Sequence, residues 1–320
     1  FEILEEALKV DSRVLASDGG VFLVKGERAL ANSLGVEAEE EGTWAKCFLE
    51  TLAREGGETT PSCFEFEASR RLNLNPRRVG RKAAETALSA LKPGKAEGGR
   101  FSIVFGQLAL SDLLSYTLIP ALQADNVQRG RSPLKGKIGQ KIASNLLTLV
   151  DDGLMGGGLQ TGGFDDEGTP MQRTVLVEDG VLKGYLYDHY YAGRENVEST
   201  GNAFRPASYA STPIIEASNF KIEPSSLSPE RLLEEVGEGF YVPYLQGAHS
   251  SNPVSGEFSV VTAPAWRIEG GTLARPVRSV MLAGTIYEIL ENLSGLASNV
   301  RMVGLLVAPW VWVENLRVIG

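Results

Sequence analysis

From about residue 146 onward, the sequence repeats one pattern of short apolar segments separated by glycine-containing turns. The clearest case is 173–187, in which Asp179-Gly180 separates two apolar stretches. Asp-Gly in that position is typical of a two-residue β-hairpin turn. The same pattern predicts further strands at 258–268, 272–282, 302–307 and 311–318. Because strands joined by short turns pair antiparallel, this half of the chain predicts a β-rich domain.

The first hundred residues mix helical and strand-like segments. Apolar residues at helical spacing predict a helix over 1–9, and Pro76 opens a second helix that ends near Lys92. Between them, the turn-forming runs Ser17–Gly20 and Glu39–Gly42 predict two successive hairpins.

The stretch Pro93–Gly99 is the best linker candidate in the chain. After it, a long helix is expected at 110–122, although Pro120 lies inside its apolar stripe. We therefore expect an α+β fold, with a smaller mixed α/β N-terminal part at 1–99 and a larger β-hairpin-rich C-terminal domain at 100–320.

Composition narrows the classes of partner. The chain has 320 residues, 43% of them hydrophobic, and a net charge of −9, which argues against a nucleic-acid or anionic-membrane binder. Its two cysteines are too few for a disulfide framework, and no apolar run reaches the ~20 residues of a membrane span. We expect a cytoplasmic protein, and the helix-like start at Phe1 predicts that a front portion is missing.

The glycine-rich, acidic and basic runs of the sequence each have a simple structural explanation. The glycine run 156–162 is interpreted as a surface loop because it lacks the lysine and the following helix of a phosphate loop. Asp151-Asp152 and Asp165–Glu167 could hold a cation, but the Asp-Gly and Glu-Gly steps after them favour turns. A basic cluster favours a solvated helix face, since no aromatic residues are interleaved with it: Arg70, Arg71, Arg77, Arg78, Arg81 and Lys82.

Histidine is scarce, which limits the chemistry. His189 and His249 are the only two, and neither has motif companions. Zinc hydrolases need two or three His, Glu, Asp or Cys ligands, and a Ser-His-Asp triad needs a base beside its serine. The sequence offers neither pattern, so we expect both histidines to be structural.

A series of short motifs identifies a family resemblance. The block 164–173 (Phe-Asp-Asp-Glu-Gly-Thr-Pro-Met-Gln-Arg), followed by Gly180–Asp188, resembles the TldD/PmbA family, historically called modulators of DNA gyrase. Supporting matches lie before and after this block, in the order in which the family has them: Arg131–Gly139, Ser199–Ala203, Val254–Phe258, Arg275–Val277 and Leu282–Gly284. The resemblance covers residues ~100–320 well and ~1–100 loosely.

The resemblance implies a zinc peptidase of two branches. The catalytic branch carries H-E-x-x-x-H on a helix and a late cysteine as a further ligand. Counting back from Arg129-Gly130 places the three motif positions at Ser115, Tyr116 and Pro120, none of which can serve as an imidazole ligand or a carboxylate base. No cysteine follows Cys63, so the chain resembles the PmbA or TldE branch, and we expect no catalytic, cofactor-binding or metal-ligating residues in it.

The function implied is that of a metal-free subunit in a two-component cytoplasmic metallopeptidase. Zinc is expected in a TldD-like partner, with which this chain would form a heterodimer around a peptide substrate. Two alternatives stay open: a homodimeric peptide-binding or regulatory protein acting on gyrase or toxin–antitoxin systems, and a peptidase with unrecognised catalytic residues. Trp310 and Trp312 predict an apolar interface if strand alternation buries one and exposes the other.

Overall fold

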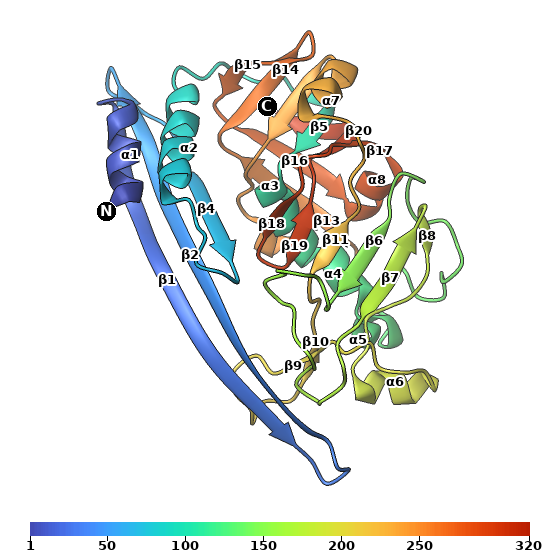
Figure 1. Ribbon diagram of the computed structural model, residues 1–320. Helices are drawn as coiled ribbons and strands as arrows, with labels where there is room; N and C mark the ends of the chain where they lie inside the picture. Colours follow the sequence, from blue (N-terminus) through green and yellow to red (C-terminus); the bar gives the residue numbers. More distant parts are fainter.

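Two antiparallel strands, β1 (Val14–Ala31) and β2 (Glu37–Glu55), form a long arm beside the rest of the molecule (Figure 1). In this computed structural model, which describes residues 1–320, β3 (Glu58–Thr59) and β4 (Cys63–Ser69) also pair with β2. Helices α1 (Glu2–Val10) and α2 (Pro76–Ser89) pack against one end of this sheet.

The arm is a single hairpin, so the prediction of two short hairpins was wrong. Ser17–Gly20 lies within β1, which continues through a register shift there, and Glu39–Gly42 lies within β2. The real turn is at residues 32–36, where the Asn32 side chain accepts hydrogen bonds from two backbone N–H groups. Gly19 serves close packing and not a turn, because a Cβ there would lie 2.8 Å from Leu49 Cδ1.

Helix α2 follows its sequence signals. Asn75 caps it by accepting a hydrogen bond from the Arg78 N–H, and Pro76 stands at its first position. At Gly80 the helix touches α1 so closely that a Cβ would lie 2.0 Å from the Ile3 carbonyl oxygen. A small core of eight buried residues joins both helices to the sheet: Ile3, Ala7, Val14, Cys47, Leu49, Val79, Ala83 and Ala84.

The remainder of the chain contains two larger sheets. The eight-stranded sheet has the order β13 (Glu257–Thr262), β16 (Val280–Thr285), β20 (Val311–Ile319), β5 (Gly99–Phe105), β12 (Gly239–Val242), β14 (Ala265–Glu269) and β15 (Thr272–Val277), with β17 (Leu293–Leu296) paired to β20. The six-stranded sheet has the order β18 (Arg301–Val303), β19 (Leu306–Ala308), β11 (Phe220–Ile222), β6 (Leu149–Asp152), β7 (Arg173–Glu178) and β8 (Val181–Leu182). The fold is therefore α+β, as predicted.

Two of the expected turns are confirmed in these sheets. Asp179 and Gly180 both have positive φ, 48° and 78°, and join β7 to β8. Gly270-Gly271 joins β14 to β15. Pairing is not antiparallel throughout, because the pairs β5–β12 and β11–β19, which are far apart in sequence, run parallel.

Helices complete the larger unit and line its core. They are α3 (Gln107–Tyr116), α4 (Leu118–Leu122), α5 (Ala124–Gln128), α6 (His189–Glu195), α7 (Pro229–Val236), α8 (Ile286–Glu291) and the 3₁₀ turn η1 (Ala248–Ser250). A core of 49 buried residues combines α3–α5 with strands of both sheets, and a small pair, β9 (Ala203–Phe204) and β10 (Ile214–Ile215), lies near the arm's lower half (Figure 1).

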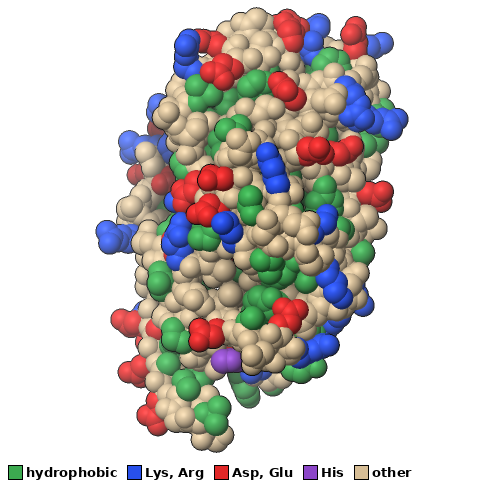
Figure 2. All heavy atoms as spheres, turned by 90° about the vertical axis from the view of Figure 1, so that its right-hand side faces the viewer, with side chains coloured by type: hydrophobic (Ala, Val, Ile, Leu, Met, Phe, Trp, Pro, Cys, Tyr) green, Lys and Arg blue, Asp and Glu red, His purple; other side chains and the backbone are tan.

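Surface charge is mixed. Figure 2 shows one face of the molecule, on which basic and acidic side chains are interspersed without a continuous field of either sign. None of the helices has the length and apolar character needed to cross a bilayer.

Candidate functional site

The segment that carries the degenerate motif is broken. The single helix predicted at 110–122 is two helices, because Thr117 (φ −128°, ψ −64°) interrupts it between α3 and α4. Proline explains the break: in a continuous helix the Pro120 ring would clash with the Tyr116 carbonyl one turn earlier, and it has no N–H to donate. The Thr117 hydroxyl donates to the Leu113 carbonyl at 2.6 Å and so satisfies one carbonyl at the end of α3.

Two of the three motif positions face a common cavity. Tyr116 and Pro120 line a space of about 270 Å³, together with residues that come from elsewhere in the chain: Asn126, Arg131, His249, Ser251, Pro253 and Val254. Ser115 does not line it, and its hydroxyl donates instead to the Ser111 carbonyl at 2.8 Å.

His249, on the 3₁₀ turn η1, also lines this cavity. Its ring is 6.5 Å from the Tyr116 ring, centroid to centroid, and the two planes are inclined by 76°. The loop around it is fixed, since Ser250 Oγ donates to the Gly247 carbonyl at 2.7 Å and Asn252 Oδ1 accepts from the Val254 N–H at 2.9 Å. Sequence reasoning did not connect His249 with the motif positions, because no local pattern links η1 to the end of α3.

The donors at this cavity do not fit a zinc site. Zinc in proteins is held by cysteine sulfur, imidazole nitrogen and carboxylate oxygen. Here His249 is the only such group, beside a phenol, an amide, a guanidinium, a hydroxyl and apolar side chains. No group of three His, Cys, Asp or Glu side chains in the structure is placed to hold a metal ion.

The other candidate ligands lie elsewhere. His189 lines a separate groove at the tip of the arm, where its Nε2 is 2.9 Å from Thr169 Oγ1. Cys47 and Cys63 are buried in the N-terminal sheet, and desolvation raises the pKa of the Cys63 thiol to about 12.

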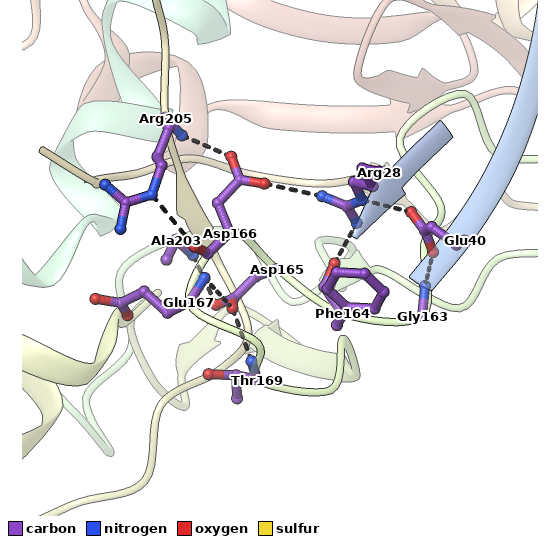
Figure 3. A network of polar contacts seen from close by, with 10 residues as sticks. All are labelled: Arg28, Glu40, Gly163, Phe164, Asp165, Asp166, Glu167, Thr169, Ala203 and Arg205. Carbon is purple, nitrogen blue, oxygen red and sulfur yellow. Dashed lines mark hydrogen bonds and ion pairs between the residues drawn. The ribbon is translucent and has the colours of Figure 1, made fainter. Parts of the chain in front are cut away.

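The acidic run 165–167 organises its own loop (Figure 3). The Asp165 carboxylate accepts hydrogen bonds from the backbone N–H groups of Glu167 and Thr169, both at 2.9 Å, and from Ala203 N–H at 3.0 Å. The turn interpretation is therefore confirmed. Asp151 is likewise structural: it is buried, burial raises its pKa, and its carboxylate accepts from Asn202 and Ser218.

Asp166 attaches the arm to the larger unit. Its carboxylate accepts from Arg28 Nη1 at 2.9 Å and from the Arg205 N–H at 2.7 Å (Figure 3). Arg28 also donates to Glu40 Oε1 at 2.7 Å, and Glu40 Oε2 accepts from the Gly163 N–H. The tip of the arm is thus fixed by charge-assisted hydrogen bonds.

Four members of the basic cluster, all on α2, line a cleft of about 960 Å³ between α2 and the eight-stranded sheet: Arg77, Arg78, Arg81 and Lys82. Aromatic side chains that are distant in sequence lie among its other lining residues: Tyr241, Tyr244, Trp266 and Trp310. The arginines of α2 are largely neutralised, because Arg77, Arg78 and Arg81 pair with carboxylates at 3.4, 3.0 and 3.3 Å.

The expectation that alternation separates Trp310 from Trp312 was wrong. Residues two apart on a strand share a face, and both tryptophans pack, half-buried, against the same small core beneath α7.

Comparison with known proteins identifies the family to which this fold belongs. Residues 1–91 match the family model of the PmbA/TldA metallopeptidase central domain, and residues 98–320 match that of the C-terminal domain. The chain belongs to the PmbA/TldD family. Within it, the chain is 37% identical over 304 residues to the uncharacterized protein MJ0231 of Methanocaldococcus jannaschii, covering 95% of this chain and 70% of that protein.

Further members of the family show the same likeness. A metalloprotease of Methanothermobacter thermautotrophicus is 31% identical over 287 residues, covering 87% of this chain and 62% of its own length. The chain thus spans less than two thirds of that relative. The crystal structure of TldE from Thermococcus kodakarensis superposes with a TM-score of 0.95 at 33% identity, covering all of this chain and 72% of that one.

Proposed function

We propose that this chain is the metal-free subunit of a two-component zinc metallopeptidase, in which a TldD-type partner supplies the metal. The observation that carries the proposal is the cavity below the broken helix. Tyr116 and Pro120 stand at motif positions, and His249 is the only residue in the lining that could bind zinc. A single imidazole cannot hold a catalytic zinc, which takes three protein ligands.

The role left for the chain is structural support of the partner and contact with the peptide. The similarity to TldE of T. kodakarensis supports this assignment over that of a catalytic subunit. No step of peptide cleavage is assigned to a residue of this chain.

Co-expression with a related chain that carries H-E-x-x-x-H tests the proposal. We expect the two chains to co-purify, zinc to accompany the pair at about one per heterodimer, and peptide turnover to require both chains. Elemental analysis and an unstructured-peptide assay with a chelator control are the measurements. Stoichiometric zinc or chelator-sensitive turnover from this chain alone would refute the proposal.

Restoring the motif alone should not create a peptidase. In the triple variant S115H/Y116E/P120H, the imidazole at position 115 would replace a hydroxyl that donates to the Ser111 carbonyl within α3. That position does not line the cavity. A working site also needs a further ligand and outer hydrogen bonds that hold each imidazole. We expect weak zinc uptake without peptide cleavage. Chelator-sensitive cleavage by the variant would contradict this expectation, because it would show that the further ligand and the hydrogen bonds that hold each imidazole are still present.

The alternative of a stand-alone homodimeric binding protein predicts a different outcome. In that case the chain would form a stable dimer by itself and would not exchange into a heterodimer when the partner is added. Light scattering of the chain with and without the partner separates the two functions.

A further inference from the structure

The cavity beside the break between α3 and α4 lacks the ligands of a metal site, but its size and polar lining are those of a small binding site. Its volume of about 270 Å³ is bounded by three separate parts of the fold, namely the α3–α4 region, the segment 126–131 and the segment 249–254. No carboxylate lines it, while Tyr116, Arg131, His249 and Ser251 all can donate hydrogen bonds. The lining is therefore suited to a ligand that accepts hydrogen bonds.

Arg131 is the one formally charged side chain in the lining, and it forms no ion pair within the chain. Its backbone is fixed, because Gly130 takes a left-handed φ of 70° and the Arg131 N–H donates to the Asn126 carbonyl at 2.8 Å. Its neighbour Arg129, by contrast, pairs with Asp125 at 3.5 Å. A free guanidinium at the edge of a small cavity has the geometry to bind a carboxylate through two parallel hydrogen bonds.

Ser251 adds a second, independent observation. Its hydroxyl oxygen is buried and has no hydrogen-bond partner in the protein. A ligand oxygen that reaches this hydroxyl would supply its missing hydrogen-bond partner.

We propose that this cavity binds a carboxylate group, with Arg131 as its counter-ion and the Ser251 hydroxyl as a further donor. Pro120, Pro253 and Val254 form the apolar part of the lining and would contact the carbon atoms beside the carboxylate. The small volume favours a carboxylate with a short apolar substituent. The C-terminal carboxylate of a peptide and a free organic acid share this chemistry. The proposal goes beyond the role proposed above and does not depend on a partner subunit.

Calorimetric titration of the purified chain tests the proposal with three probes: acetyl-Ala-Ala with a free carboxylate, the same dipeptide as its C-terminal amide, and propionate. We expect the free acid to bind and the amide to show no heat of binding at the same concentration. Binding of propionate as well would identify a site for free organic acids, and its failure to bind would identify a site for peptide C-termini. Both results support carboxylate recognition.

Three variants and one control assign the site. R131Q should weaken binding of the free acid at least tenfold, R131K should recover part of the affinity, and S251A should weaken it by a smaller factor. R71Q removes an equal charge from an exposed arginine outside the cavity and should bind as the parent does. The proposal is overturned if no probe binds, if the amide binds as well as the acid, or if R131Q, folded by circular dichroism, retains full affinity.

Discussion

Arg301→Ala should be among the most destabilising single substitutions in the chain. Arg301 on β18 donates to the Glu65 carboxylate on β4 and, at 2.9 Å, to the Phe66 carbonyl, and its guanidinium lies 5.0 Å from the Phe66 ring centroid. It thereby joins the N-terminal sheet to the larger unit. The Glu65 side chain is only 7% exposed, so its charge is left largely desolvated when Arg301 is removed.

The magnitude follows from what remains around Glu65. Without Arg301, the Phe66 N–H at 3.0 Å is the only hydrogen-bond donor left to the carboxylate. Breaking a buried ion pair from one side costs about 3–5 kcal/mol. We therefore expect a loss of about 3 kcal/mol at pH 7.

Urea unfolding of the parent and of R301A at pH 7 measures this loss. The double variant R301A/E65Q removes the charge and should lose less stability than R301A. Arg231→Ala is the matched control, since its partner Glu234 is 53% exposed and the pair should contribute less than about 1 kcal/mol. A loss for R301A below about 1 kcal/mol at pH 7, or a loss for R301A/E65Q as large as that for R301A, would refute the reasoning.

Two further predictions concern the N-terminal part. Gly80→Ala should destabilise the protein by about 1–3 kcal/mol, although alanine favours helices, because its Cβ would overlap the Ile3 carbonyl. Gly193→Ala in α6 is the control: it has open space around it and should be neutral or stabilising by up to about 1 kcal/mol. Thermal unfolding of the two variants measures the difference. Cys47 and Cys63 should resist a thiol reagent at pH 8.5 in the folded chain and react fully in denaturant, because both are buried and desolvation raises the pKa of Cys63 to about 12. Rapid labelling of either cysteine under native conditions would contradict the expected resistance. The folded state keeps a proton that the unfolded Cys63 thiol releases near pH 8.5, so the free energy of unfolding should fall as pH rises from there toward 12.

Local sequence signals predicted those elements that are decided by a few neighbouring residues. Pro76 stands at the first position of α2 as expected, and Asp179-Gly180 makes its hairpin turn. The long arm was missed because Gly19-Gly20 resembles a turn, whereas both glycines lie within β1, with the side chains of Leu49 and Phe48 beside them. The true turn depends on a side-chain hydrogen bond from a single residue, Asn32, which a search for paired turn residues passes over.

The candidate site was predictable in part. Counting from the glycine motif led to Tyr116 and Pro120, and both line the cavity, while Ser115 does not. The proline inside the apolar stripe was the available signal for the helix break. His249 and Arg131 could not have been assigned to the same cavity, because they meet only through the tertiary packing of separate loops.

The two parts of the molecule are joined by polar contacts and not by a shared apolar core. Each buried cluster lies wholly on one side of the linker, the largest within residues 103–318 and the arm's within residues 3–84. Contacts across the boundary are instead Arg28 with Asp166 at the tip of the arm, Arg301 with Glu65 near its base, and the Tyr244 hydroxyl on the Phe64 carbonyl at 3.0 Å. Polar contacts depend on direction more strongly than apolar ones, so they fix the orientation of the arm while adding little to the free energy of unfolding where they are exposed.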